Sequence, residues 1–243
     1  MKPYFETEDG KLYCNDCLEA IPELDFENIK LVVTDPPFNY RHMGSGFSKN
    51  SKLSNRTYLY KIKQLKNGCD FEPEPMLDIL WTSMDQFYGY FFCNKTLVNR
   101  YINWAINKNL NYDILIMGKI NCVPAHHNHH LSDIEYVMLI RAPGTYFSDD
   151  EQFHNYKKIQ LVSCKTTKIH PCQKSVASMY KYIRVSSKAG DIILDPYFGS
   201  GTTGIACRRL DRKWIGIEDS KEICDIAIER IKQETAQYKM ELT

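Results

Sequence analysis

Four acidic residues follow short apolar segments that have the length and composition of β-strands. They are Asp16 after Leu12-Tyr13-Cys14, Asp35 after Leu31-Val32-Val33, Asp195 after Ile192-Ile193-Leu194, and Glu218 after residues 214–217. In an open α/β sheet, ligands bind outside the carboxyl ends of the strands. Each acid taken alone is as typical of a helix N-cap, but four together predict a site for a ligand with several N–H donors or positive charges.

A glycine-rich loop runs from Asp195 to Gly204. Its sequence, DPYFGSGTTG, satisfies the GxGxxG pattern, in which glycine lets the backbone approach a ligand closely. Such a loop normally opens a nicotinamide- or flavin-binding fold, whereas only about 40 residues follow it here. This late position argues against a nicotinamide-dependent dehydrogenase, which we weigh as an alternative.

The stretch Thr34-Asp-Pro-Pro-Phe-Asn39 follows a β-branched strand segment. Its two prolines fix φ and remove two N–H donors, so rigid carbonyl oxygens remain. Asp35 and the Pro36 carbonyl can accept both hydrogens of a heterocyclic amine, while Phe38 stacks on its ring. Accepting both hydrogens favours a pyramidal nitrogen whose lone pair faces a methyl donor. Taken alone, a Pro-Pro pair is also typical of a simple turn.

Strand-like and helix-like segments alternate along the rest of the chain. Further strands are expected at 90–92, 112–117 and 136–140, and helices at 75–88, 96–108, 175–187, 202–210 and about 220–237. Alternation of this kind predicts a doubly wound, mostly parallel α/β sheet with helices on both faces.

The composition is typical of one globular domain. The 243 residues are 43% hydrophobic and 25% charged, which excludes a fibre or a largely disordered chain. No apolar run approaches the roughly 18 residues of a membrane span, and no secretory signal is visible, so we expect a cytoplasmic protein. The nine cysteines include one CxxC pair, Cys14 and Cys17, and we expect reduced, mostly buried thiols.

Charges are segregated along the chain although the net charge is only +1. Residues 1–30 contain three Lys against eight Asp or Glu, and residues 41–70 contain seven Lys or Arg against one Asp. Residues 157–188 contain eight Lys or Arg and no acid. This segregation predicts a polyanion-binding surface, although either basic segment alone is as typical of a solvated loop.

The order of the motifs resembles that of a known enzyme family. The matching stretches are LYCNDCLEAIPEL, LVVTDPPFN, YFFCNKTL, YDILIMGK, EYVMLIRAPG, HPCQKS and DIILDPYFGSGTTGIACRRLDRKWIGIE. They resemble the S-adenosylmethionine-dependent DNA amino-methyltransferases of the permuted β type, in which DPPY or DPPF precedes the FxGxG loop. The resemblance covers most of the chain. It implies one methyltransferase domain over residues 1–243, with a Rossmann-like sheet, circularly permuted motif order and an antiparallel strand pair at one edge.

The resemblance also implies residue roles. Catalysis and base holding fall to Asp35, Pro36, Pro37 and Phe38. Binding of S-adenosyl-L-methionine, with S-adenosyl-L-homocysteine as product, falls to Asp16, Cys17, His170, Gln173, Lys174, Asp195, Phe198, Gly199, Ser200, Gly201, Thr202, Thr203 and Glu218. Within this set, Glu218 accepts from the ribose, Asp16 accepts from the adenine amine, and Asp195 lies near the methionyl ammonium. Cys172 and Ser175 stand where the family usually has Thr and Pro.

DNA recognition departs from the family pattern. Members usually carry a substantial recognition region between EYVMLIRAPG and HPCQKS, and here only residues 146–168 are available as a short candidate. We expect a partly flexible basic insertion, 39–75, to supply much of the DNA contact. Its candidate contacts are Asn39, Arg41, Lys49, Lys52 and Arg56. The expected partner is DNA and not a membrane, with the protein acting as a monomer, a homodimer or together with a partner subunit.

The implied activity is site-specific methylation of the N6 amine of adenine in a flipped-out base. Two alternatives stay open: N4 methylation of cytosine, whose enzymes more often carry Ser before Pro-Pro, and a catalytically silent DNA-binding partner subunit. The histidine-rich run 126–130 is also typical of a metal site. We expect no metal, because no Cys or acid stands at ligand spacing and the chemistry needs none.

Overall fold

The computed structural model describes residues 1–37, 71–120, 130–131, 133–148, 157–162 and 174–241, with side chains through residue 234. Its strands are β1 (Phe5–Thr7), β2 (Gly10–Cys14), β3 (Ile29–Thr34), β4 (Tyr88–Cys93), β5 (Asn111–Lys119), β6 (Ile134–Arg141), β7 (Ile159–Val162), β8 (Ile192–Asp195) and β9 (Lys213–Glu218). Its helices are α1 (Cys17–Ala20), the 3₁₀ turn η1 (Ile21–Glu23), α3 (Glu74–Ser83), α4 (Val98–Asn107), α5 (Val176–Ser186), α6 (Thr202–Arg208) and α7 (Lys221–Glu241). Every strand and helix expected from the sequence is present, but the helix predicted at 75–88 ends at Ser83, and Tyr88 already begins β4.

Within the described residues, the nine strands form one sheet in the order β1-β2-β9-β8-β3-β4-β6-β5-β7. The five central strands β2, β9, β8, β3 and β4 run parallel. Strand β6 runs antiparallel between β4 and β5, and β1 is antiparallel to β2 at the other end. The predicted mostly parallel sheet is therefore confirmed. The expected antiparallel pair at one edge is formed by β1 and β2. A second antiparallel pair, β5 and β6, lies inside β7, which pairs in parallel with β5.

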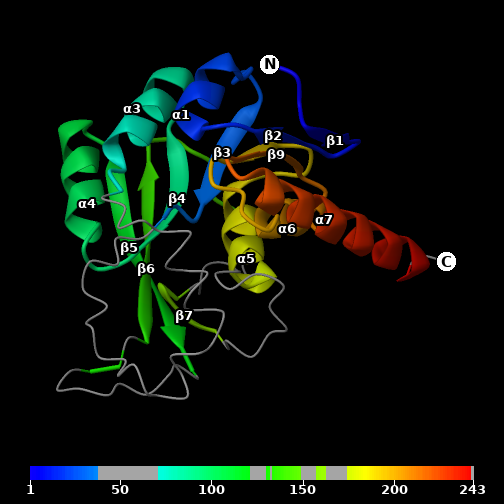
Figure 1. Ribbon diagram of the computed structural model, residues 1–243. Coiled ribbons are helices and arrows are strands. Elements are labelled where there is room, and N and C mark those ends of the chain that lie inside the picture. Colours follow the sequence, from blue (N-terminus) through cyan, green and yellow to red (C-terminus); the bar gives the residue numbers. More distant parts are fainter. Residues whose placement is uncertain (38–70, 121–129, 132, 149–156, 163–173, 242–243) are drawn as a thin grey trace, which may run out of the picture.

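Helices cover both faces of the sheet (Figure 1). Helices α5, α6 and α7 pack on one face and α1, α3 and α4 on the other, each against its own buried apolar cluster. Successive side chains of β4 show why: Tyr90 and Phe92 enter the first cluster, whereas Phe91 and Cys93 enter the second. Because side chains alternate across a strand, a strand apolar at every position must be covered on both sides, as parallel sheets are.

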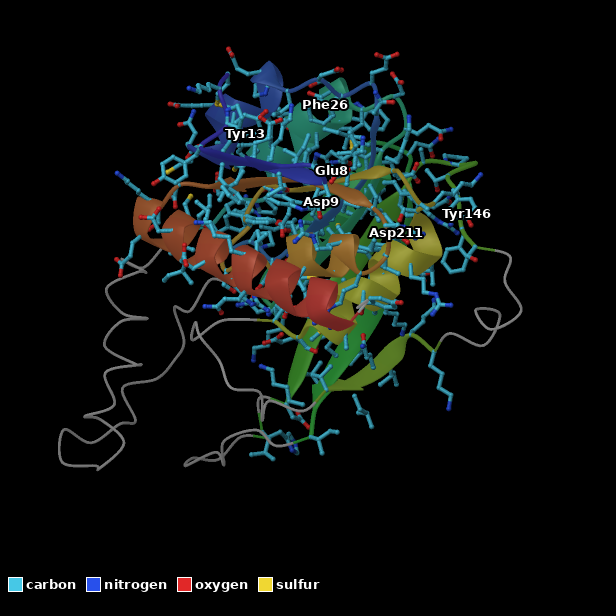
Figure 2. The ribbon with its side chains drawn as sticks, turned by 90° about the vertical axis from the view of Figure 1, so that its right-hand side faces the viewer. Glu8, Asp9, Tyr13, Phe26, Tyr146 and Asp211 are labelled. Carbon is cyan, nitrogen blue, oxygen red and sulfur yellow. The ribbon has the colours of Figure 1, made fainter. Side chains whose placement is uncertain are left out.

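Helix α7 crosses the sheet beside α6, as the turned view of Figure 2 shows. An ion pair links the β1–β2 turn to the end of α6. Arg208 Nε donates to Asp9 Oδ2 and Arg208 Nη2 donates to Asp9 Oδ1, each at 2.6 Å. Such bidentate pairs fix geometry as well as charge. No helix among the described residues is long and apolar enough to cross a membrane.

The topology determines where loops can meet. The carboxyl ends of the five parallel strands lie along one edge of the sheet, called the rim below. Strand β6 is antiparallel to β4, with Cys93 opposite Tyr136, so its first residues lie at the rim. Strand β5 ends there as well, because Met117 lies opposite Glu135. Loops from distant parts of the sequence therefore converge at the rim.

Candidate active site

The four predicted acids all lie at the rim. Cys14 at the end of β2 lies opposite Glu218 at the end of β9. Asp195 ends β8, and Asp35 directly follows β3. Asp16 is exposed and caps α1, since its Oδ1 accepts from the Leu18 N–H at 2.7 Å. The prediction that these acids share one edge of the sheet is confirmed.

A buried hydrogen bond joins the two motifs that the sequence places far apart. The Thr34 hydroxyl donates to Asp195 Oδ1 at 2.7 Å, and the Thr203 hydroxyl donates to Asp195 Oδ2 at 2.5 Å. The Tyr197 N–H also donates to Oδ1, at 3.1 Å. Burial raises the pKa of Asp195 to about 6, against these hydrogen bonds, which lower it. Asp195 is 2% exposed, so its carboxylate fastens the acidic turn after β3 to the glycine loop.

The glycine loop needs glycine at two positions. Gly199 has φ 52° and Gly201 has φ 79°, in the left-handed region that side chains with a Cβ rarely adopt. Among the described residues, a Cβ on Gly199 would meet only the Tyr197 carbonyl, at 3.9 Å, so within this part of the chain the backbone is open to the rim. The Gly199 N–H donates to Glu218 Oε2 at 3.0 Å, and the Ser220 N–H donates to Oε1 at 3.1 Å. The loop is therefore shaped for close approach of a ligand and is held beside a half-buried carboxylate.

The Phe198 ring lies in the core rather than at the rim. It is 3% exposed and stacks on Trp214 with a centroid distance of 4.9 Å and an interplanar angle of 16°. A Cβ added to Gly216 would stand 2.4 Å from this ring, and one added to Gly204 would stand 2.8 Å from it. These glycines therefore make room for Phe198, whose backbone alone remains available to a ligand in the loop.

Arg230 of α7 supports the loop from beneath. Its Nη1 donates to the Ser200 carbonyl at 2.9 Å, to the Ser200 hydroxyl at 3.1 Å and to the Thr202 hydroxyl at 2.9 Å. Burial lowers the pKa of Arg230. Three contacts from one buried guanidinium fix the loop conformation, and they give Ser200 and Thr202 partners within the protein.

Asp35 lies beside a lysine from a distant segment. The Lys174 ammonium is 3.2 Å from Asp35 Oδ1, and the Asp35 side chain is 21% exposed. Pro36 is buried and Pro37 half-buried. The turn therefore presents a partly accessible carboxylate paired with a cation, next to the loop that lets a ligand approach. This arrangement can hold an amine by its N–H groups and accept a proton from it.

Several predicted residues lie outside the described part of the chain. They are Phe38, Asn39, Arg41, Lys49, Lys52, Arg56, His170 and Gln173. Of the basic insertion 39–75, only residues 71–75 are described. Of the recognition candidate 146–168, strand β7 is described and pairs with β5. Most of the histidine-rich run also lies outside the described residues, and the described ranges contain no cluster suited to a metal ion.

Sequence reasoning missed Glu135 and Lys119, which are linked to Asp35 through Lys174. Lys174 also contacts Glu135 Oε2 at 2.9 Å, and Lys119 contacts Glu135 Oε1 at 2.6 Å. Burial raises the pKa of Glu135, but the two ammonium groups outweigh it and bring the pKa to about 2. The pattern offered one signal: Glu135 is a charged residue directly before the apolar run 136–140.

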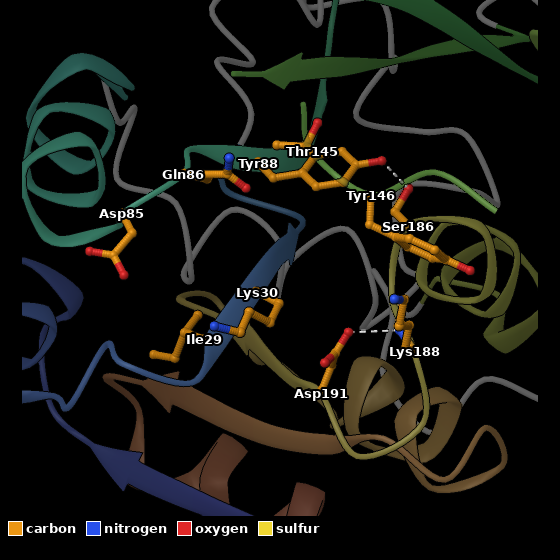
Figure 3. A pocket seen from close by; sticks show the side chains of 10 residues that line it. All are labelled: Ile29, Lys30, Asp85, Gln86, Tyr88, Thr145, Tyr146, Ser186, Lys188 and Asp191. Atoms are coloured by element: carbon orange, nitrogen blue, oxygen red, sulfur yellow. Dashed lines mark hydrogen bonds between the residues drawn. The ribbon is translucent and has the colours of Figure 1, made fainter. Parts of the chain in front are cut away.

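A cavity of about 410 Å³ lies on the side of the sheet opposite the rim, where the parallel strands begin. Figure 3 shows it near the beginnings of β3 and β8, with Lys30 on one side and Asp191 and Lys188 on the other. Tyr88 donates to the Ser186 hydroxyl within its wall at 2.6 Å. Of the predicted site residues that the structure describes, none lines this cavity, so their candidate chemistry belongs to the rim.

Several known proteins are similar to this chain in sequence. The family described as DNA methylase matches residues 29–229. The Type II methyltransferase M.HpaI of Haemophilus parainfluenzae is 27% identical over 251 residues, which cover 93% of this chain and 75% of that protein. M2.MboI of Moraxella bovis, also described as a Type II methyltransferase, is 28% identical over 262 residues, covering 99% and 95% respectively.

Solved structures are also similar to this chain in fold. A crystal structure described as the M1.HpyAVI–SAM complex has a TM-score of 0.68 at 25% identity, over 91% of this chain and 99% of that one. The PvuII DNA methyltransferase, described as cytosine-N4-specific, has a TM-score of 0.70 at 16% identity, over 98% and 94%. The second likeness concerns the fold alone.

Proposed function

Because this chain belongs to the DNA methylase family, we propose that it methylates the exocyclic N6 amine of adenine in DNA. S-adenosylmethionine is the donor, and it supplies a methyl group activated by a positively charged sulfur. The second candidate is the N4 amine of cytosine, the specificity given for the PvuII enzyme of the same fold. Asp35 before Pro-Pro favours adenine.

The residues at the rim suit this donor. The open backbone at Gly199 and the left-handed glycines let the loop lie against the methionyl part. We assign the ribose hydroxyls to Glu218, whose carboxylate is already oriented by two backbone N–H groups. Asp16 and the Cys17 backbone, at the end of the adjacent β2, complete the site on the adenine side. Asp195 organises the loop from beneath.

Asp35 and the Pro36 carbonyl bind the acceptor amine in this proposal. The lone pair of the amine is conjugated into the base and is a weak nucleophile. Two acceptors that hold both hydrogens localise this lone pair, and catalysis then consists mostly of positioning and hydrogen bonding. Once the methyl group has moved, the nitrogen carries a positive charge, and Asp35 accepts the proton that it loses.

The hydrogen bond from Thr34 to Asp195 carries the proposal. It joins residues 161 positions apart, one adjoining the base-binding turn and the other opening the cofactor loop. Parallel pairing of β3 with β8, with Val32 opposite Leu194, supports the same juxtaposition. Donor and acceptor can meet at one place only if these two loops are neighbours.

The reaction product tests the proposal. Incubation with S-adenosylmethionine labelled in its methyl group and mixed DNA, followed by nucleoside mass spectrometry, should yield labelled N6-methyldeoxyadenosine. Labelled N4-methyldeoxycytidine would replace the adenine assignment by the second candidate. Absence of label from a protein that binds both S-adenosylhomocysteine and DNA would instead indicate a silent partner subunit.

We also propose how the enzyme meets DNA. The basic stretch within 41–70 would neutralise phosphates and supply affinity, and the short 146–168 region would contribute to recognition. We expect a cytoplasmic enzyme that acts on a base flipped out of the helix. It would act as a monomer or homodimer, or with a partner subunit.

Cofactor binding should depend on pH through Glu218. Burial raises the pKa of Glu218 to about 7, and only its ionised form offers both oxygens as acceptors. The Kd of S-adenosylhomocysteine should therefore fall by about tenfold in total as pH rises through about 7, and level off on either side. Calorimetry between about pH 5.5 and about pH 8, where the ligand itself does not titrate, measures this slope.

Two variants separate Glu218 from general effects of pH. Glu218→Gln should bind about tenfold more weakly above pH 7 and lose the slope. Glu222→Gln, an exposed carboxyl in the first turn of α7, should keep both the affinity and the slope. A wild-type Kd that stays flat across this range would contradict the role given to Glu218.

A further inference from the structure

Lys174 lies between two carboxylates at the rim. Its ammonium is 3.2 Å from Asp35 Oδ1 and 2.9 Å from Glu135 Oε2, and it stands 5.4 Å from the centroid of the Phe92 ring. The Lys174 side chain is only 12% exposed. Burial opposes its charge, but Asp35 and Glu135 outweigh burial and raise the pKa of Lys174 above its ordinary value. The lysine is therefore a fixed cation rather than a mobile surface group.

Glu135 owes its place to the antiparallel strand. It is the second residue of β6, which begins at the rim because β6 runs against β4. Lys119 at the end of β5 holds its other oxygen at 2.6 Å, from the neighbouring strand. Glu135 is 15% exposed. Its side chain is held in place by this contact with Lys119 of the neighbouring strand.

These contacts form an alternating row of charges: Lys119, Glu135, Lys174 and Asp35. In a partly buried site, an ion pair gains from exact placement and loses when one member is removed, since the remaining charge is left uncompensated. At one end of the row, Lys119 and Glu135 lie on neighbouring strands of the sheet. At the other end lies Asp35, the residue with the proposed function. Through Glu135 and Lys174, the sheet can therefore fix the position of the Asp35 carboxylate, at which the amine binds.

We propose that Glu135 is a positioning residue for methyl transfer: it anchors the Lys174 ammonium, and the anchored ammonium aims the Asp35 carboxylate at the acceptor amine. This assignment rests on the proposed role of Asp35. It gives Lys174 a task at the base-binding side of the site, where the sequence resemblance had implied contact with the cofactor. Neither Glu135 nor Lys119 touches the reacting atoms in this account.

Other titratable groups also face Asp35. They are Asp195 at the end of β8, Cys93 at the end of β4 and Tyr101 of α4. Burial raises the pKa of Cys93 to about 12 and that of Tyr101 well above its ordinary value, so both stay neutral near neutral pH. Burial raises the pKa of Asp195 to about 6, and the variants proposed below leave Asp195 and its hydrogen-bond partners Thr34 and Thr203 in place. Differences between pH profiles therefore report on the charged row.

The two members of the row should shift the pH profile in opposite directions. Lys174→Met removes the cation beside Asp35, so Asp35 should take up a proton more readily and the acid limb of the rate should move up by about one pH unit. Glu135→Gln removes an anion and leaves Lys174 to Asp35, so the acid limb should move down by a few tenths of a unit. Both variants should also transfer methyl at least about tenfold more slowly, because the acceptor is less well placed.

The measurement is the single-turnover rate of methyl transfer against pH, expressed per S-adenosylhomocysteine-binding site so that any misfolded fraction drops out. The control is Glu74→Gln, which makes the same chemical change in an ion pair with Arg100, between α3 and α4. It should keep the wild-type rate within about twofold and the wild-type profile. Cofactor Kd should be unchanged in Glu135→Gln.

The outcomes separate this inference from the proposed function. Opposite shifts with reduced rates support the positioning role. A Glu135→Gln enzyme with the rate and pH profile of Glu74→Gln, in a background where wild type methylates DNA, overturns it. Rescue supplies an independent check: Lys174→Arg keeps the positive charge and should hold the acid limb within a few tenths of a unit of wild type, and a shift as large as that of Lys174→Met would also overturn it. Failure of the proposed function would show earlier, as no methylated nucleoside from wild type.

Discussion

The Asp35→Ala variant is expected to lose methyl transfer by about a thousandfold or more while it binds S-adenosylhomocysteine within about threefold of wild type. Asp35 supplies the acceptor that localises the amine lone pair and takes its proton, and alanine supplies neither. The cofactor contacts, in contrast, lie on the loop that Asp195, Arg230 and Glu218 organise. Single-turnover rates and calorimetry measure the two effects separately.

A matched control sets the scale for this loss. Asp85→Ala removes an exposed carboxylate from the cavity at the opposite edge of the sheet and should leave the rate within about twofold of wild type. Asp35→Asn keeps one oxygen acceptor but cannot accept the proton, so its rate should lie between those of wild type and Asp35→Ala. An Asp35→Ala enzyme that retains a tenth of its activity would be incompatible with the proposed mechanism.

The second large effect concerns stability. Phe198→Ala should lower the free energy of unfolding by about 3–5 kcal/mol, because it empties a buried ring site that Trp214, Gly204 and Gly216 enclose. Phe198→Leu fills part of this space and should cost about 1–2 kcal/mol. Denaturant unfolding monitored by tryptophan fluorescence measures both, with the slope of the transition as a check on two-state behaviour.

Cofactor affinity tests whether the Phe198 ring lies in the core or lines the cofactor site. Since the Phe198 ring faces the core, folded Phe198→Leu protein should bind S-adenosylhomocysteine within about threefold of wild type. A ring that lined the cofactor site would give the reverse: nearly unchanged unfolding and a much weaker Kd. Tyr197→Leu, next in sequence but half-buried, provides the comparison at a neighbouring aromatic residue, and it should cost less stability than Phe198→Ala.

Strong periodicity is why most of the fold could be predicted. The apolar runs at 31–33 and 192–194 are too short for helices and too apolar for surface strands, which predicted their burial within a parallel sheet. The short strands β1 and β7 escaped prediction, because polar residues interrupt both of them and neither contains an unbroken apolar run of three. β7 also leaves Ile159 and Leu161 exposed, so its sequence lacks the pattern of a covered strand.

The acids of the site were predictable because each follows a strand, but their individual tasks were not. Nothing in the sequence distinguishes Asp195, whose oxygens accept hydrogen bonds inside the protein, from Glu218, which stays half-buried at the rim. Glu135 was missed because the strand order that brings β6 next to β4 determines its position. Only the fold places the start of that strand at the same edge as Asp35.

The central claim is that the turn at Asp35 and the loop at Gly199–Thr203 form one site for methyl transfer. A crystal structure with S-adenosylhomocysteine and DNA tests it most directly. We predict that the sulfur lies over the glycine loop and that the flipped base's amine binds Asp35, leaving about 3–3.5 Å between that nitrogen and the position of a transferable methyl group. Cofactor bound instead in the cavity between Lys30 and Lys188, or an amine held away from Asp35, would contradict the claim.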